Sequence, residues 1–317
     1  MEPALLLEDV SKRYADHVAV DDLSLSVPPG TIYGILGPNG AGKSSTLRMA
    51  MNIIARDSGR VLLLGRDPAV DPAVLHRVGY LPEERGLYKK MRVLDVIVFF
   101  GRLKGMDAST ARSEGERWLA RMGLGDWRRS RVETLSKGMQ QKVQFITTVI
   151  HRPELLILDE PASGLDPVNQ EVLKETILEA RDDGRTVVFS THNMAEAEQL
   201  CESVCIIAQG RKVLDGGLRE IRRENRGNRW RVDFEAVPPE AEAVISRTAG
   251  EATVTRTESG WEIGLAPGRE PHALMAALGQ LEPLPLRFER VEPTLHEIFV
   301  ERVGNAANPR RREVVHA

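Results

Sequence analysis

The sequence of 317 residues predicts an α/β domain of about 200 residues followed by a smaller α+β domain. Three observations predict this arrangement. Short apolar runs alternate with helix-like segments over residues 1–218, and a glycine-rich loop joins one such run to a helix. The composition then changes after Asp215-Gly216-Gly217, where a charged segment leads into a second set of short strands and helices.

The glycine-rich loop follows the apolar run 32–36 and matches the P-loop pattern G-x-x-x-x-G-K-[ST]. In this pattern the backbone N–H groups surround phosphates, while Lys43 reaches the β/γ oxygens and Ser44 binds Mg²⁺. An incidental glycine-rich turn is the alternative, and the strand–loop–helix setting argues against it. We therefore predict a nucleoside triphosphate site at Gly37, Pro38, Asn39, Gly40, Ala41, Gly42, Lys43, Ser44 and Ser45.

A second apolar run, 155–158, ends in two adjacent carboxylates, Asp159 and Glu160, in a Walker B pattern. Neighbouring strand residues point to opposite faces, so the two acids are expected to perform different tasks. One can hold Mg²⁺ through its water shell while the other faces the attacking water. Capping of a turn or helix is the alternative, but capping alone does not explain two acids that accompany a phosphate loop.

Three further motifs complete the pattern: Leu135-Ser136-Lys137-Gly138, Ser163-Gly164-Leu165-Asp166 and Ser190-Thr191-His192. Their order resembles that of the ATP-binding subunits of ABC transporters over residues 5 to about 218. The resemblance implies an ABC ATPase domain with a RecA-like core, a β-subdomain and a helical insert at about 90–150. It also implies ATP and Mg²⁺ as cofactors, and a head-to-tail homodimer with each ATP between the phosphate loop of one copy and the L-S-x-G segment of the other.

The resemblance assigns roles to single residues as well. Glu160 would polarise the attacking water as general base, and His192 would contact the γ-phosphate. Mg²⁺, held by Asp159 and Ser44, would stabilise charge together with Lys43. The remaining ATP contacts would be Tyr14 on the adenine, Ser136 and Gly138 across the interface, and Asp166 between the copies. Taken alone, Tyr14 could be an ordinary half-buried tyrosine and His192 a core or surface histidine.

The chain departs from the family pattern at two places. Glu83 stands where the family usually has a glutamine, and it adds negative charge beside the triphosphate. A carboxylate can still approach Mg²⁺ through an oxygen, so we hypothesise that Glu83 is a metal contact. Lys137 and Met139 replace the usual glycine and glutamine of the L-S-x-G segment, which keeps Ser136 and Gly138.

The C-terminal third predicts a βαββαβ order, which is a ferredoxin-like sandwich. Its segments are the strand 229–236, helix 239–248, strands 252–257 and 261–265, helix 271–281 and strand 284–291. We expect a linker at 219–228, an accessory domain at 229–303 and a loose tail at 304–317. Thr294 and Glu297 form a capping-box pattern before the last helix. This layout and the stretch 81–88 resemble ABC-2-type export ATPases of the sodium-extrusion-like kind.

Composition is consistent with this interpretation. The net charge of −3 provides no basic field for nucleic acid. No apolar stretch approaches the ~20 residues that cross a bilayer, and the N-terminus has no secretion signal. Cys201 and Cys205 are predicted to be reduced, buried thiols. The basic cluster Arg128, Arg129 and Arg131 is predicted to lie in a solvated loop, with contact to a membrane subunit or to lipid as the alternative.

We therefore expect an ATPase subunit of an exporter. It would be cytoplasmic and peripheral on the inner face of the cell membrane, bound to separate transmembrane permease chains. Three alternatives remain open at this point. They are the ATPase of a metabolite importer whose C-terminal domain senses a ligand, an ABC protein acting on ribosomes or DNA, and a nucleotide-binding regulator without turnover.

Overall fold

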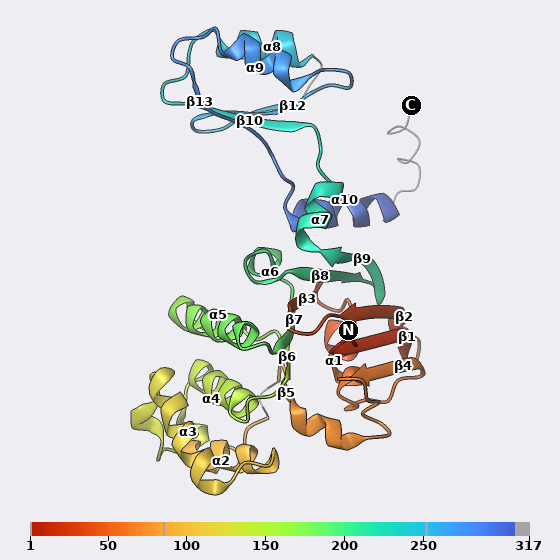
Figure 1. The fold of residues 1–317 in the computed structure, drawn as a ribbon, viewed down its shortest axis with the longest axis vertical. Helices are drawn as coiled ribbons and strands as arrows, with labels where there is room; N and C mark the ends of the chain where they lie inside the picture. Colours follow the sequence, from red (N-terminus) through yellow and green to blue (C-terminus); the bar gives the residue numbers. More distant parts are fainter. Residues whose placement is uncertain (1, 85, 251–252, 308–317) are drawn as a thin grey trace. The chain divides into compact units, whose positions relative to one another are not determined.

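The computed structural model describes residues 2–84, 86–250 and 253–307. The chain divides into two compact units; the second is Arg219–Gly304, and the first contains the residues up to Leu218 and those from Asn305 onward. The first unit contains two sheets (Figure 1). The antiparallel sheet has the order β2-β1-β4, with β1 (Leu5–Tyr14), β2 (His17–Val27) and β4 (Ser58–Leu63). The larger sheet has the order β5-β6-β7-β3-β8-β9, with β3 (Ile32–Leu36), β5 (Val78–Leu81), β6 (Leu155–Asp159), β7 (Thr186–Thr191), β8 (Ser203–Ala208) and β9 (Arg211–Gly217).

The larger sheet is parallel from β5 to β8, and β9 adds an antiparallel edge. Every residue of β3, β6 and β7 is buried, which explains the apolar runs in these strands; the buried polar residues lie at the ends of β6 and β7. In register, Asp159 on β6 lies opposite Ser190 on β7, and Leu36 on β3 lies opposite Thr191. The segments that follow these three strands therefore meet beyond the carboxyl ends of the strands.

Among the described residues, the α-helices of this unit include α1 (Lys43–Ala50), α2 (Val93–Leu103), α3 (Ala108–Arg121), α4 (Lys137–Val149), α5 (Pro167–Asp182) and α6 (Met194–Leu200). The predicted helical insert contains α2, α3 and α4. The apolar spacing of Leu94, Ile97, Val98, Gly101 and Leu103 predicts one buried stripe along α2. Leu94, Ile97 and Gly101 are buried and Val98 is half-buried, but Leu103 is 54% exposed. The buried stripe therefore ends at Gly101, two residues earlier than the sequence pattern indicates.

The second unit contains the antiparallel sheet β11-β12-β10-β13 and the two helices α8 (Ala241–Ala249) and α9 (Pro271–Leu278). The strands are β10 (Arg229–Phe234), β11 (Thr253–Arg256), β12 (Gly260–Gly264) and β13 (Pro285–Arg290). The order βαββαβ with this strand arrangement confirms the predicted ferredoxin-like sandwich. Its core lies between sheet and helices and includes Val232, Phe234, Ile245, Trp261, Ile263 and Leu274. Of the predicted strand 252–257, Ala252 lies outside the described residues.

Two further helices, α7 (Leu218–Glu224) and α10 (Leu295–Ala307), flank the sandwich in sequence. The segment predicted as a linker thus contains a helix. Thr294 and Glu297 form the predicted capping box, since each backbone N–H donates to the other residue's side chain, at 2.8 and 3.1 Å. The prediction of a loose tail from residue 304 is wrong for residues 304–307, because α10 continues through them; residues 308–317 lie outside the described part.

Candidate functional site: a nucleotide cavity at the sheet edge

The loop between β3 and α1 wraps its backbone around an open space. Gly42 has a φ of 104°, and a Cβ built on it would lie 2.3 Å from the carbonyl oxygen of Ala19. At Gly37, with a φ of 151°, a Cβ would lie 2.2 Å from the carbonyl oxygen of Ile207. A larger residue fits neither position without displacing backbone, so these glycines are required for the loop's shape.

This loop forms one wall of a cavity of about 320 Å³. The lining residues are Tyr14, His17, Ala19, Asn39, Gly40, Ala41, Gly42, Lys43, Ser44, Ser45, Glu83 and Glu160. Tyr14 ends β1 and is 45% exposed, so its ring is available to a planar ligand. The structure therefore brings the phosphate loop, Tyr14, Glu83 and Glu160 together, while His17 and Ala19 are lining residues that the sequence motifs did not indicate.

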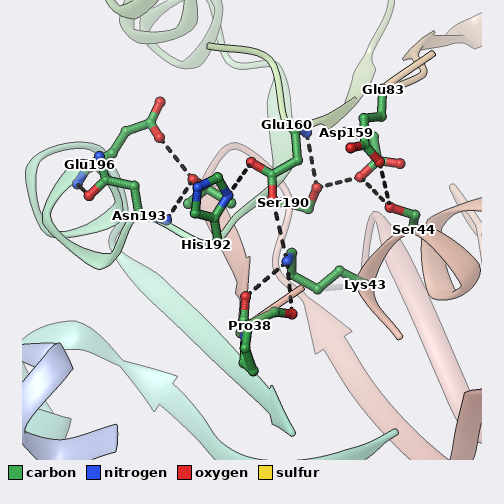
Figure 2. Close-up of polar contacts among 12 residues, drawn as sticks. Pro38, Lys43, Ser44, Glu83, Asp159, Glu160, Ser190, His192, Asn193 and Glu196 are labelled. Atoms are coloured by element: carbon green, nitrogen blue, oxygen red, sulfur yellow. Dashed lines mark hydrogen bonds and ion pairs between the residues drawn. The ribbon is translucent and has the colours of Figure 1, made fainter. Parts of the chain in front are cut away.

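Lys43 and Glu160 form a buried charged pair at the floor of this cavity. The Nζ of Lys43 lies 3.4 Å from Oε1 of Glu160 and donates to the carbonyl oxygens of Gly37 and Pro38 at 2.8 and 3.3 Å. Lys43 and Glu160 are only 6% and 9% exposed. The other oxygen of Glu160 lies 3.0 Å from Nδ1 of His192 (Figure 2). Glu160 is thus held between a cation and an imidazole.

The backbone of Glu160 adopts a φ of +48°, in the left-handed region that costs a non-glycine residue energy. Its N–H donates to the carbonyl oxygen of Ser190 at 3.2 Å and to the Oγ of the same residue at 3.1 Å. These bonds hold the turn that directs Glu160 away from Asp159. The two adjacent acids consequently reach different partners, as the sequence pattern predicts.

Asp159 lies at the end of β6 with none of its surface exposed. Its Oδ1 accepts hydrogen bonds from Ser44 Oγ at 3.1 Å and from Ser190 Oγ at 2.5 Å. Its Oδ2 is buried and has no hydrogen-bond partner among residues 2–84, 86–250 and 253–307. Glu83 also approaches, with Oε2 3.5 Å from the hydroxyl of Ser44.

This set of oxygens fits a magnesium ion. Carboxylate and hydroxyl oxygens are hard ligands, and Mg²⁺ is usually held by one or two protein groups together with waters and substrate phosphates. In the described part of the chain no group of three or more His, Cys, Asp or Glu residues could hold a metal. A magnesium ion bound beside Asp159 would therefore complete its shell with phosphate and water oxygens.

Ser190 is a further site residue to which the sequence interpretation gave no role. It is fully buried and contacts both acids, through the side chain of Asp159 and the backbone N–H of Glu160. It stands two residues before His192 in the Ser190-Thr191-His192 motif, from which only the histidine received a role. Its position opposite Asp159 depends on the pairing of β6 with β7, which sequence alone does not specify.

Ser136, Gly138 and Asp166 do not line the cavity of their own chain. Ser136 begins α4 and accepts a hydrogen bond from the N–H of Met139 at 3.2 Å. Asp166 begins α5 in the same way, accepting from the N–H of Asn169 at 3.1 Å. Both are helix N-caps. The cavity is therefore formed without any contribution from the L-S-x-G segment.

Other expectations can be compared with the structure. Cys201 and Cys205 are free and buried, which confirms the prediction, and burial raises the pKa of both thiols. Arg128, Arg129 and Arg131 are exposed on the segment between α3 and α4. Within the described residues, no helix combines the length and the apolar composition that crossing a membrane requires.

Comparison with known proteins identifies the family. Residues 20–163 match the family model described as ABC transporter, and residues 216–303 match that of the C-terminal domain of DrrA1-3-like ATP-binding proteins. The ABC transporter ATP-binding protein YhaQ of Bacillus subtilis is 40% identical over 303 residues, covering 95% of this chain and 98% of the relative. This chain belongs to the ABC transporter ATP-binding proteins. It is an ABC ATPase, and proteins of this family bind nucleotide.

Other members of the family are similar to this chain, either over most of its length or over about 70% of it. The daunorubicin/doxorubicin resistance ATP-binding protein DrrA of Streptomyces peucetius is 32% identical, covering 95% of this chain and 93% of the relative. A solved ATP-binding subunit of an ABC transporter superposes with a TM-score of 0.66 at 29% identity, covering 70% of this chain and 92% of that one. A dimeric ATP-binding cassette bound to ADP and Pi shares the fold, with a TM-score of 0.63 at 21% identity, covering 68% and 99%.

Proposed function

We propose that this ABC ATPase drives export through separate membrane-spanning permease chains. The observation that carries the proposal is its similarity along both units to DrrA, together with the match of residues 216–303 to the DrrA1-3-like C-terminal domain. The daunorubicin/doxorubicin resistance named for that relative fits removal of a compound from the cell. In this proposal the subunit sits at the inner face of the cell membrane, bound to the permease.

In the proposed reaction, Glu160 accepts a proton from the water that attacks the γ-phosphate. Burial beside Lys43 and His192, at 3.4 and 3.0 Å, positions its carboxylate. Lys43 stabilises negative charge on the phosphates, and Tyr14 stacks on the adenine. Ser44 and Asp159 would hold Mg²⁺, which supplies charge neutralisation when bound.

We further propose that two copies pair head to tail when ATP binds. Ser136 opens a helix of 13 residues, so free N–H groups and a partial positive charge lie at that end of α4. Since neither Ser136 nor Gly138 reaches the cavity of its own chain, they are free to contact ATP held by another. The dimeric cassette that shares this fold supports such a pairing.

The permease is proposed to dock in an apolar cavity of about 540 Å³ beside the Glu83 segment. Its walls include Met51, Ile53, Tyr80, Leu87, Phe100 and His151. Gln144 of α4 donates to the carbonyl oxygens of Pro82 and Glu84, each at 3.1 Å. Because these residues flank Glu83, movement of a docked permease segment would be transmitted to the nucleotide cavity.

Substitution of Glu83 by glutamine tests its proposed metal contact. The change removes a carboxylate 3.5 Å from Ser44, so the Mg²⁺ concentration that half-saturates ATP hydrolysis should rise about tenfold, equivalent to one charged contact. Titrating MgCl₂ at fixed ATP measures this. Glu84→Gln, one residue later, is the matched control and should leave the Mg²⁺ profile within about twofold, because surface pairs contribute little. An unchanged profile in Glu83→Gln would remove Glu83 from the metal site.

The permease assignment is tested by purifying the tagged chain from detergent-solubilised membranes of the cells in which it occurs. A multi-span protein should co-purify in fixed proportion. Ile53→Asp should reduce its recovery by about tenfold, because the docked segment would bury an unpaired carboxylate. Val70→Asp, at a site that is 83% exposed and outside this cavity, should not. Absence of any integral membrane protein, or equal recovery with Ile53→Asp, would contradict the assignment.

A further inference from the structure

Strand β13 forms one edge of the C-terminal sheet. The strand order β11-β12-β10-β13 pairs it with β10 on one side and with no other described strand on the other. At the start of this edge Leu284 and Leu286 are 62% and 70% exposed. An unpaired strand edge with exposed apolar side chains is a template for pairing with another strand.

The hydrogen bonds to β10 determine which backbone groups of β13 face outward. The N–H of Val291 donates to the carbonyl oxygen of Arg229 at 2.9 Å, so these two residues form a hydrogen-bonded pair. Antiparallel pairs alternate, and the register therefore directs Arg287 and Glu289 toward β10 as well. The N–H and C=O groups of Phe288 and Arg290 point to the free edge.

The side chains along this edge carry opposite charges in a symmetrical order. Phe288 packs with the core and stacks on Trp230 with ring centroids 5.0 Å apart. Because side chains alternate along a strand, Arg287 and Glu289 lie on the face that α8 and α9 do not cover. Their side chains are 55% and 53% exposed, and they stand one residue before and one after Phe288. Within the strand they form an ion pair at 3.5 Å, and Arg287 also lies 3.8 Å from Asp233.

We propose that β13 pairs with β13 of a second copy of this chain, antiparallel and about a two-fold axis at Phe288. Phe288 of each copy then forms a hydrogen-bonded pair with Phe288 of the other, as the outward groups require. Arg287 of each copy faces Glu289 of the other, which favours this register. Moving the two-fold axis by one residue, to Arg287 or to Glu289, also keeps the hydrogen bonds. It would place Arg287 opposite Arg287 or Glu289 opposite Glu289, so like charges would face each other.

The strand at the opposite edge of the sheet, β11, does not have this arrangement of opposite charges. Strand β11, Thr253–Arg256, contains no acidic residue, so two copies of it would bring no opposite charges together. The β13 contact also uses neither the phosphate loop nor the L-S-x-G segment. It forms without nucleotide and is independent of the proposed transport function.

Disulfide trapping in the full-length chain tests the register. Two variants, Arg287→Cys and Glu289→Cys, are made in the Lys43→Ala background with tags of different size and oxidised without nucleotide. In the proposed register, positions 287 and 289 form a non-hydrogen-bonded pair with Cα atoms about 4.5 Å apart, within disulfide range. The mixture should give a cross-linked heterodimer. Neither variant alone should give a cross-linked dimer. The native cysteines, Cys201 and Cys205, are buried and should contribute little background cross-linking.

The result that overturns the proposal is equally specific. Cross-linking of Arg287→Cys or Glu289→Cys with itself, as efficiently as in the mixture, would exclude this register. A chain without introduced cysteines that sediments as a monomer at concentrations up to about 100 μM, together with no cross-link in the mixture, would exclude the interface.

Sedimentation of charge variants provides a second measurement. Arg287→Glu should weaken nucleotide-free dimerisation by about tenfold, because the two-fold axis replaces two attractive pairs with two repulsive ones. Arg247→Glu on α8 makes the same charge change at an exposed position away from the edge and should leave the dimer unchanged. An equal effect of both variants would show a general charge effect and would contradict the proposal.

Discussion

Replacement of Glu160 by glutamine is expected to slow ATP hydrolysis by roughly 10² or more while ATP still binds. Glutamine keeps the size of the side chain and can still bond His192, which lies 3.0 Å from the carboxylate. It cannot accept a proton from water, so only the chemical step is lost. Single-turnover hydrolysis measures the rate, and size-exclusion chromatography with ATP should show an accumulated dimer.

The matched control for this change is Glu154→Gln. Glu154 directly precedes β6, whereas Glu160 directly follows it. The carboxylate of Glu154 pairs with Arg77 in an exposed salt bridge. Loss of an exposed pair has a small effect, so turnover should stay within about twofold of the unmodified chain. Near-normal turnover in Glu160→Gln would refute its assignment as general base.

Lys43→Ala is expected to weaken ATP binding by about 10²-fold, because it removes a charged phosphate contact and leaves Glu160 uncompensated in a buried site. The Nζ of Lys43 is 3.4 Å from Glu160 and is only slightly exposed, so water cannot replace it easily. Equilibrium titration with a fluorescent ATP analogue at fixed Mg²⁺ measures the dissociation constant.

A double variant separates the two causes. If repulsion from unpaired Glu160 contributes, Lys43→Ala/Glu160→Gln should bind ATP more tightly than Lys43→Ala alone. Lys90→Ala, an exposed lysine outside the cavity lining, should leave the dissociation constant unchanged. A dissociation constant for Lys43→Ala within about threefold of the unmodified value would show that the lysine does not hold the phosphates.

Local patterns in the sequence predicted much of this molecule because each has a local physical cause. The phosphate loop needs glycines wherever a Cβ would strike backbone, as at Gly37 and Gly42, so its composition is visible in the chain. Helix caps are equally local: in the predicted capping box, Thr294 and Glu297 lie three residues apart, and each side chain accepts from the other's N–H. The βαββαβ order of the C-terminal domain is also predicted from local patterns, because side chains alternate between apolar and polar along a half-exposed strand.

The sequence predictions were wrong or incomplete where burial, helix length or a residue's role depends on contacts between distant parts of the chain. Leu103 continues the apolar stripe of α2 in sequence but is 54% exposed, because burial depends on which segments pack against each turn of the helix. Helix α10 extends to Ala307, past the residue at which the polar composition suggested a loose tail. Ser190 received no role, because a serine shows its function only when its strand is paired with the one that carries Asp159.

The sequence by itself determined the family pattern, the phosphate loop, the pair of acids and the division into two folded units, because these depend on residue type and short spacing. Tertiary structure alone decided that Glu160 lies between Lys43 and His192, that Ser190 joins both acids, and that β13 is left at a sheet edge. Each of these depends on which strands lie side by side, and that follows from packing of the whole core.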